Sequence, residues 1–64
     1  MSAALSDRPD DGADLVGSCH TIGPIGPPYQ VVATARDGKV AIMLLESGET
    51  VEYPTREVRE DPVA

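Results

Sequence analysis

The sequence predicts a mostly β protein: a small antiparallel meander that curls into an SH3-like, partly open barrel and ends in one helical turn. Two turn dipeptides, Asp37-Gly38 and Ser47-Gly48, separate three runs rich in strand-forming residues between positions 29 and 53. Apolar and polar residues alternate along these runs, with the period of a strand that has one buried face. A curled meander without barrel closure is the alternative architecture.

Before the first strand, residues 1–14 carry four aspartates and show no apolar periodicity. Such a composition cannot bury enough apolar surface to offset the entropy lost on ordering. We therefore expect a disordered acidic tail over residues 1–14, or an arm that folds on a partner, and a single β-barrel domain over residues 15–62. A domain of this size buries only about 60% of its unfolded surface, so its core is small.

The domain is expected to begin with a short strand over residues 15–22. Five of the next six residues, 23–28, are Gly or Pro. Proline lacks a backbone donor and restricts the residue before it, so this segment is expected to be a rigid connector.

The two turn dipeptides also predict how the strands pair, because Asp-Gly favours a two-residue hairpin loop. With two-residue loops, Ala33 faces Ile42 across the first turn, and Ile42 faces Tyr53 across the second. The two hairpins, taken separately, place the same residues on one face, which is the predicted core. These residues are Val31, Ala33, Ala35, Val40, Ile42, Leu44, Val51 and Tyr53.

The opposite face is mixed, and it carries a second apolar patch formed by Val32, Met43 and Leu45. A meander with one solvated face does not need these side chains. Either the strand over residues 15–22 covers them, or another protein or a second copy in a homodimer does. Val32, Met43 and Leu45 are therefore the candidate protein-contact residues.

After the last strand, residues 54–62 show the pattern of one helical turn. Thr55 is expected to cap its N-terminus, and Glu57 to lie in the first turn, where a negative charge is favourable. Pro62 ends the helix, and Val58 is expected to point toward the core.

The charge and hydropathy of the chain argue against several partners. Eleven acidic and five basic residues give a formal net charge of −6, which repels a phosphate backbone, so no nucleic-acid partner is expected. No run reaches the roughly 18 apolar residues of a membrane helix, so no membrane association is expected. Polar residues 6–11 interrupt any secretory signal, and a cytoplasmic location is expected.

Few groups in the sequence could support catalysis or hold a metal. Cys19 is the single cysteine, which excludes an intrachain disulfide and a cysteine-rich zinc site. Adjacent strand residues point to opposite faces, so we expect a buried Cys19 beside a surface His20 rather than a nucleophile–base pair. No Gly-rich phosphate loop is present. The chain is therefore expected to be no enzyme, with no catalytic residue, cofactor or metal.

Several short stretches carry a resemblance to a known family. They are Val16-Gly17, the Gly- and Pro-rich stretch Gly23–Tyr29, the stretch Leu45–Glu49 and the pair Tyr53-Pro54. In these stretches the chain resembles a family of short bacterial proteins, the domain of unknown function DUF5397. The resemblance covers roughly residues 15–62 and implies a bacterial source, but no activity, ligand or catalytic residue.

Two functions are compatible with these observations. The first is a non-catalytic protein-interaction module, a regulator or accessory subunit, that uses the Val32–Met43–Leu45 patch or the acidic edge. The second is an acidic inhibitor that mimics nucleic acid and occupies a basic groove of a nucleic-acid-binding protein. Mimicry requires carboxylates that line one face at phosphate-like spacing, so the positions of the acidic residues discriminate between the two.

Overall fold

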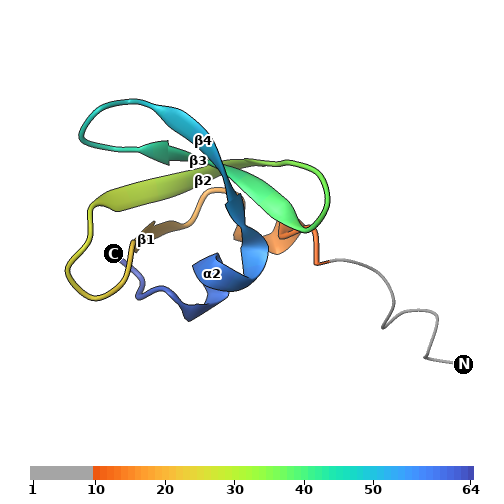
Figure 1. Cartoon of the computed structure of the whole chain (residues 1–64), viewed down its shortest axis with the longest axis horizontal. Helices are drawn as coiled ribbons and strands as arrows, with labels where there is room; N and C mark the ends of the chain where they lie inside the picture. Colours follow the sequence, from red (N-terminus) through yellow and green to blue (C-terminus); the bar gives the residue numbers. More distant parts are fainter. Residues whose placement is uncertain (1–9) are drawn as a thin grey trace, which may run out of the picture.

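The protein folds into a four-stranded antiparallel sheet with a short helix across one of its faces (Figure 1). This architecture is seen in a computed structural model that describes residues 10–64. The elements in chain order are the 3-10 helix η1 (Ala13–Leu15), β1 (Cys19–Thr21), β2 (Pro28–Thr34), β3 (Lys39–Leu44), β4 (Thr50–Pro54) and α2 (Thr55–Glu60). Each strand pairs with the next, so β1 and β4 are the edges and the sheet does not close. The predicted β meander with a C-terminal helical turn is confirmed.

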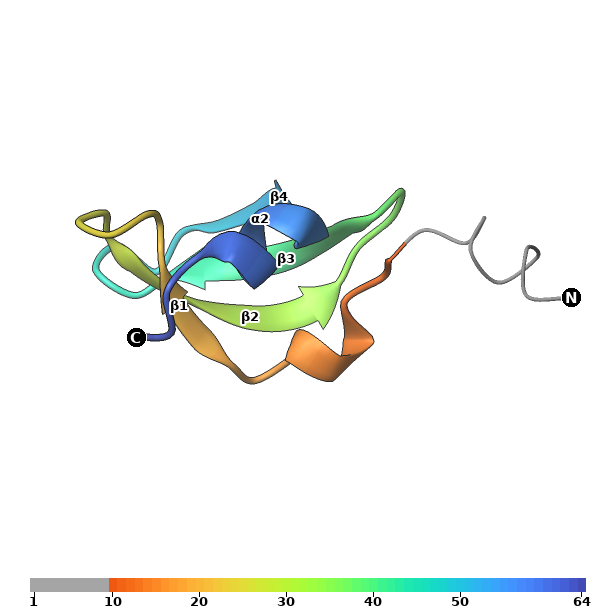
Figure 2. The same ribbon diagram turned by 90° about the horizontal axis from the view of Figure 1, so that it is seen from below.

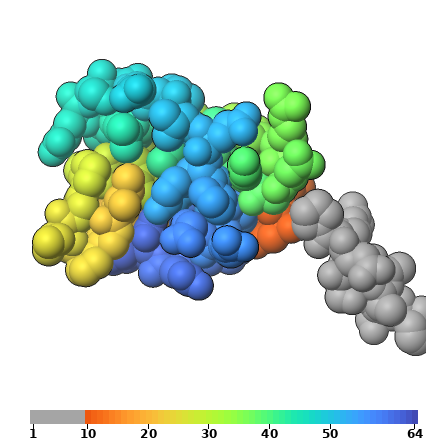
Figure 3. Space-filling view, viewed as in Figure 1, coloured from red at the N-terminus to blue at the C-terminus, as the bar shows by residue number. Residues whose placement is uncertain are grey.

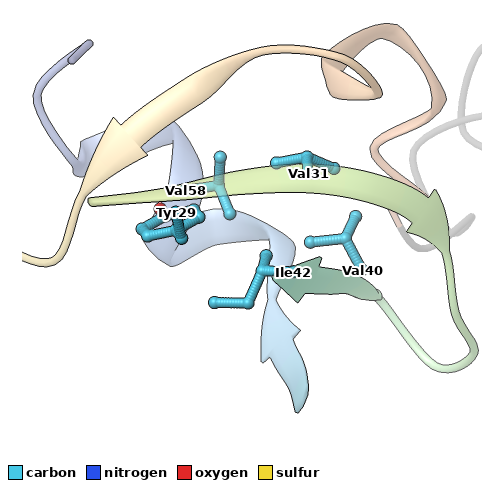
Figure 4. Packing of buried hydrophobic residues seen from close by; sticks show 5 residues of the cluster. All are labelled: Tyr29, Val31, Val40, Ile42 and Val58. Carbon is cyan, nitrogen blue, oxygen red and sulfur yellow. The ribbon is translucent and has the colours of Figure 1, made fainter. Parts of the chain in front are cut away.

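One face of the sheet carries the hydrophobic core. Figure 2 shows α2 lying across this face, and Figure 4 shows side chains of β2, β3 and α2 meeting between the sheet and the helix. The fully buried hydrophobic residues are Tyr29, Val31, Val40, Ile42 and Val58. Leu15, Leu44 and Tyr53 are partly buried and pack around them. The predicted placement of Val31, Val40, Ile42 and Val58 in the core is confirmed.

The turn between β2 and β3 has the predicted conformation. Asp37 and Gly38 have φ angles of 55° and 74°, and the Lys39 N–H donates to the Arg36 oxygen at 3.1 Å. Asp-Gly suits this turn because both central residues need positive φ. The pairing beyond the turn differs, because the N–H of Ala35, and not that of Arg36, donates to the Lys39 oxygen at 3.0 Å.

A β-bulge between Val31 and Ala33 shifts the register of β2 against β3 a second time. Val31 pairs with Ile42 and Ala33 with Ala41, so the predicted pairing of Ala33 with Ile42 is wrong. The two one-residue shifts add up to two residues. The part of β2 that precedes the bulge, Val31 included, therefore keeps its predicted face. After the bulge the alternation is lost, and Ala33, predicted in the core, is exposed.

The hairpin between β3 and β4 has a longer loop than predicted. The Leu44 N–H donates to the Glu49 oxygen at 2.8 Å, and the Gly48 N–H donates to the Leu44 oxygen at 2.7 Å. These bonds close a loop over residues 45–48, so Ile42 pairs with Val51 and not with Tyr53 as predicted. A shift of two residues keeps the side chains of β3 and β4 on their predicted faces. Val51, predicted in the core, is nevertheless 38% exposed, because β4 is an edge strand.

The N-terminal segment differs from the predicted tail in its described part. Gly12 is buried with a φ of 72°, and a Cβ at this position would lie 2.6 Å from Cγ1 of Val40. Arg59 of α2 donates to both Asp10 and Asp14, each at 2.9 Å from its Nη2. Residues 10–14 therefore pack on the domain, and the rest of the predicted tail, residues 1–9, lies outside the described residues.

The C-terminal helix begins one residue earlier than predicted. Pro54 occupies the N-cap position without a side-chain cap, and Thr55 is the first helical residue and is buried. The prediction of Thr55 as N-cap is therefore wrong, because its side chain packs inward toward Gly12. Glu57 lies in the first turn as predicted, and the helix ends before Asp61, whose N–H bonds back to Glu57 and Val58.

Candidate protein-contact surface

The face of the sheet opposite the core carries the predicted apolar patch. Met43 follows Ile42 in β3, so it points to the opposite, outer face, where its register partners are Gln30 and Thr50. Met43 itself is half-buried. Val32, in the bulge of β2, is 39% exposed, and Leu45, at the start of the β3–β4 loop, is 46% exposed. The bulge and the loop thus bring two exposed apolar residues to either side of Met43 along the sheet.

The strand near the N-terminus does not cover this patch. β1 pairs edge to edge with β2 and extends the sheet. Leu15 of η1 packs against the core cluster, on the same side as Val58 of α2. The predicted alternative, in which residues 15–22 bury Val32, Met43 and Leu45, is therefore wrong. Within residues 10–64, both helices pack on the core side of the sheet and leave the outer face to solvent.

A buried polar network, which sequence reasoning missed, joins the C-terminal segment to the core. The Tyr29 hydroxyl donates to Oδ2 of Asp61 at 2.6 Å, and the Tyr53 hydroxyl donates to the same oxygen at 3.0 Å. The Gly23 N–H donates to Oδ1 of Asp61 at 3.2 Å. The two tyrosine rings meet edge to face with centroids 5.4 Å apart. One carboxylate therefore ties β2, β4 and the β1–β2 loop to the end of α2.

The environment of Asp61 shifts the pKa values of the whole network. Burial would raise the pKa of the Asp61 carboxyl, but hydrogen bonds from Tyr29, Gly23 and Tyr53 together lower it below its usual value. Burial, followed by the bond to Asp61, raises the pKa of Tyr53 to about 12. The same two causes raise the pKa of Tyr29. The network is therefore most stable with an ionised carboxylate and two protonated tyrosines.

His20 is part of the core, which corrects the prediction of a surface His20 beside a buried Cys19. It pairs with Tyr29 in the sheet, is 5% exposed and stacks on the Tyr29 ring at 5.8 Å. The Ser18 hydroxyl donates to the Leu15 oxygen at 2.6 Å, so His20 Nε2, 2.9 Å away, must donate to Ser18. The hydroxyl proton is thus held by a backbone oxygen and not by the histidine, an arrangement that fixes a loop and does not activate a nucleophile. The half-buried Cys19 points to the other face.

A chemical site within residues 10–64 would need clustered ligands or a cavity. No group of three metal-ligating side chains comes together there, and no pocket opens in the surface of this part of the chain. His20 Nδ1 and Thr55 Oγ1 are buried without a hydrogen-bond partner among these residues. Both atoms lie inside the packed core, where no space for a ligand adjoins them.

The acidic residues are spread over the molecule and partly engaged within it. Asp10 and Asp14 bind Arg59, whose hydrogen bonds lower the pKa of both carboxyls, and Asp61 binds the two tyrosines. The other described acids lie on the N-terminal segment, both hairpin loops, β4 and α2. They are Asp11, Asp37, Glu46, Glu49, Glu52, Glu57 and Glu60. This distribution does not form a single acidic face, but it concentrates three glutamates around β4 and the loop before it.

These features define a small, open β-meander domain with one covered and one uncovered face. Comparison with family models places residues 4–64 in a family of unknown function, DUF5397, and the chain belongs to this family. No curated protein matches the chain, and no solved structure matches it. None of the helices found in residues 10–64 has the length and apolar character needed to cross a membrane.

Proposed function

We propose that the chain is a non-catalytic protein-interaction module, a regulator or accessory subunit, that binds another protein through the outer face of its sheet. The observation that carries the proposal is the uncovered patch of Val32, Met43 and Leu45, two of which are exposed by 39% and 46%. A core this small benefits from every apolar side chain it can bury, so apolar residues kept outside it favour a contact surface.

The charge around the patch indicates the chemistry of the partner. Glu46 and Glu49 lie in the loop beside Leu45, and Glu52 lies on β4. An apolar centre with an acidic margin is complementary to an apolar surface bordered by Lys or Arg.

The proposal has two further parts. The protein acts in the cytoplasm, and its sheet is curved like that of SH3-type barrels.

The second candidate, an acidic inhibitor that mimics nucleic acid, has weaker support. Mimicry needs free carboxylates in a row, whereas Asp10, Asp14 and Asp61 are engaged by Arg59 and the tyrosines. The remaining acids are divided among loops, a strand and a helix. The apolar centre of the outer face, which a nucleic-acid mimic does not need, favours the first proposal.

The proposal is tested by placing a charge in the centre of the patch. Cross-linking in the native host identifies proteins that contact the chain, and the dissociation constant of each purified candidate is then measured. Met43→Lys should weaken binding by roughly tenfold or more, because a buried contact is replaced by a charge. Ile25→Lys introduces the same charge at a residue of the β1–β2 loop that is 96% exposed, and should leave binding unchanged.

Two outcomes contradict the proposal. If Met43→Lys and Ile25→Lys bind equally well, the outer face is not the contact surface. If the partner is a nucleic-acid-binding protein released by neutralising Glu57 and Glu60 and not by Met43→Lys, the mimic is the better account.

A further inference from the structure

The two edges of the sheet differ in backbone pairing: the β1 edge is paired with another segment, and the β4 edge is not paired within residues 10–64. The C-terminal segment covers the β1 edge: the Thr21 N–H donates to the Pro62 oxygen at 3.1 Å, and the Ala64 N–H donates to the Cys19 oxygen at 3.0 Å. An isolated bridge joins His20 to Val63 between these bonds. No segment of residues 10–64 pairs in this way with the outer edge of β4. Figure 1 shows β4 at the border of the sheet.

The hydrogen bonds that flank β4 establish which of its backbone groups are free. Glu49 accepts from the Leu44 N–H, and the Thr55 N–H donates to the Gly38 oxygen, so both residues bond toward β3. In an antiparallel ladder, bonded and non-bonded residues alternate. Val51 and Tyr53 therefore also bond to β3, and the N–H and C=O of Thr50 and Glu52 point away from the sheet.

We propose that β4 of a second copy of this chain pairs with this edge in an antiparallel arrangement about a two-fold axis that passes beside Val51. Thr50 of each copy exchanges both backbone hydrogen bonds with Glu52 of the other. The two Val51 side chains then face each other as a non-bonded pair, in which side chains approach most closely. Val51 is 38% exposed in the single chain, and the contact covers it.

The residues of β4 select a second copy and this register. A two-fold centred on Glu52 sets Glu52 against Glu52 and requires an N–H from Pro54, which has none. A two-fold centred on Thr50 sets Val51 against Glu49. With the two-fold centred on Val51, Val51 faces Val51 and Glu52 faces Thr50. Every free backbone N–H is then paired, and no like charges lie directly opposite each other. The edge is complementary to itself in one register.

The same register predicts how the dimer responds to salt. Both Glu52 side chains lie on the outer face of the joined sheet, in diagonal positions, with further glutamates in the adjacent loops. Their repulsion opposes association and is screened as ionic strength rises. The dissociation constant should therefore fall with added salt, opposite to an interface held by ion pairs.

The edge and the outer face are separate surfaces, so this dimer does not depend on the proposed binding of another protein. Joining two β4 strands makes one continuous sheet and leaves Val32 and Met43 of each copy uncovered. Met43→Lys should therefore not raise the dimer dissociation constant. The failure of one proposal is thus distinguishable from the failure of the other.

Sedimentation equilibrium of the full chain, from about 10 μM to about 1 mM, measures the dimer. Glu52→Pro removes the outward N–H without removing a bond to β3, and proline is tolerated at such edge positions. Glu52→Ala, the matched control, removes the same charge but keeps the N–H. Glu52→Pro should raise the dissociation constant roughly tenfold or more, because each copy loses a donor. Glu52→Ala should leave it unchanged or lower it.

Amide hydrogen exchange of the unaltered protein provides a second measurement that needs no variant. Protection of the Thr50 and Glu52 amides should rise with protein concentration, while that of Val51 and Tyr53 stays constant. The proposal is overturned if the chain is monomeric over the whole concentration range, in which case Glu52 and Pro54 protect the edge against pairing. It is also overturned if Glu52→Pro and Glu52→Ala weaken the dimer equally.

Discussion

Ile42 and Met43 are neighbours in β3, and their surroundings are opposite. Ile42 is fully buried among Val31, Val40 and Val58, beneath α2. Met43 lies between the polar side chains of Gln30 and Thr50 on a face that no described helix covers. Among residues 10–64, one face of the sheet therefore builds the core.

The covered face is closed by segments from both ends of the described chain. Leu15 and Val58 of α2 pack on it, and Asp61 bonds to the hydroxyls of Tyr29 and Tyr53. In the space-filling view of Figure 3, the α2 region lies beside the N-terminal described residues. Within residues 10–64 the outer face has no such cover, which supports the proposed contact with another protein.

The largest effect is expected from truncation in the covered face. Ile42→Ala should lower the free energy of unfolding by roughly 2–5 kcal/mol, because it leaves a cavity in the core. Thr50→Ala, on the outer face, should lower it by less than half as much. Urea denaturation of both variants measures the difference, and equal losses would mean that the two faces are assigned the wrong way round.

The N-terminal cover is tested at Gly12. Gly12→Ala should lower the free energy of unfolding by about 1–3 kcal/mol, because alanine disfavours positive φ and its methyl group overlaps Val40. Thermal unfolding followed by circular dichroism measures it. Gly17→Ala, also at positive φ but with open space around the new Cβ, separates backbone strain from the overlap. Identical losses in the two variants would show that residues 10–14 do not pack on the core.

The polar network predicts a smaller effect that depends on pH. Tyr29→Phe should lower the free energy of unfolding by about 1–2 kcal/mol at neutral pH, since Asp61 loses a hydrogen bond. The pKa of Asp61 is lowered on folding, so its contribution is present above the usual value of 3.8 and is lost as pH falls through the folded value. The difference between wild type and Tyr29→Phe should therefore shrink below about pH 4.

Asp10 and Asp14 titrate in the same window, because Arg59 lowers the pKa of both. They are the same in wild type and in Tyr29→Phe, so the difference between the two proteins reports Asp61. Denaturant titrations at several pH values measure it. A difference that stays constant down to pH 2 would mean that the Tyr29–Asp61 bond does not contribute to stability.

In β3 and β4, which side chains share a face was predictable, and how the strands pair was not. The period of two in β3 and β4 predicts the core side of Val40, Ile42 and Tyr53. This prediction survives a longer loop as long as the register shifts by an even number of residues. The loop length depends on the bond from the Gly48 N–H to Leu44, and the bulge after Val31 has no clear signal in sequence. Neither is marked by the pattern of apolar and polar residues.

The polar network was missed because its partners are distant in sequence. Tyr29 and Asp61 are separated by 32 positions, and no short motif joins them. One signal was present: a tyrosine on the core face needs a partner for its buried hydroxyl. The outer-face position of Met43, in contrast, was predictable, because alternation alone places it opposite Ile42. That Val32, Met43 and Leu45 contact another protein stays a prediction.

If the outer face is a contact surface, its side chains should contribute little to the free energy of unfolding. The direct measurement is the free energy of unfolding of Met43→Lys beside that of wild type, from urea denaturation. We expect a loss below about 1 kcal/mol, because a half-buried lysine can extend its charge into solvent. A loss as large as that of Ile42→Ala, or failure to fold, would contradict it and make the patch part of the core.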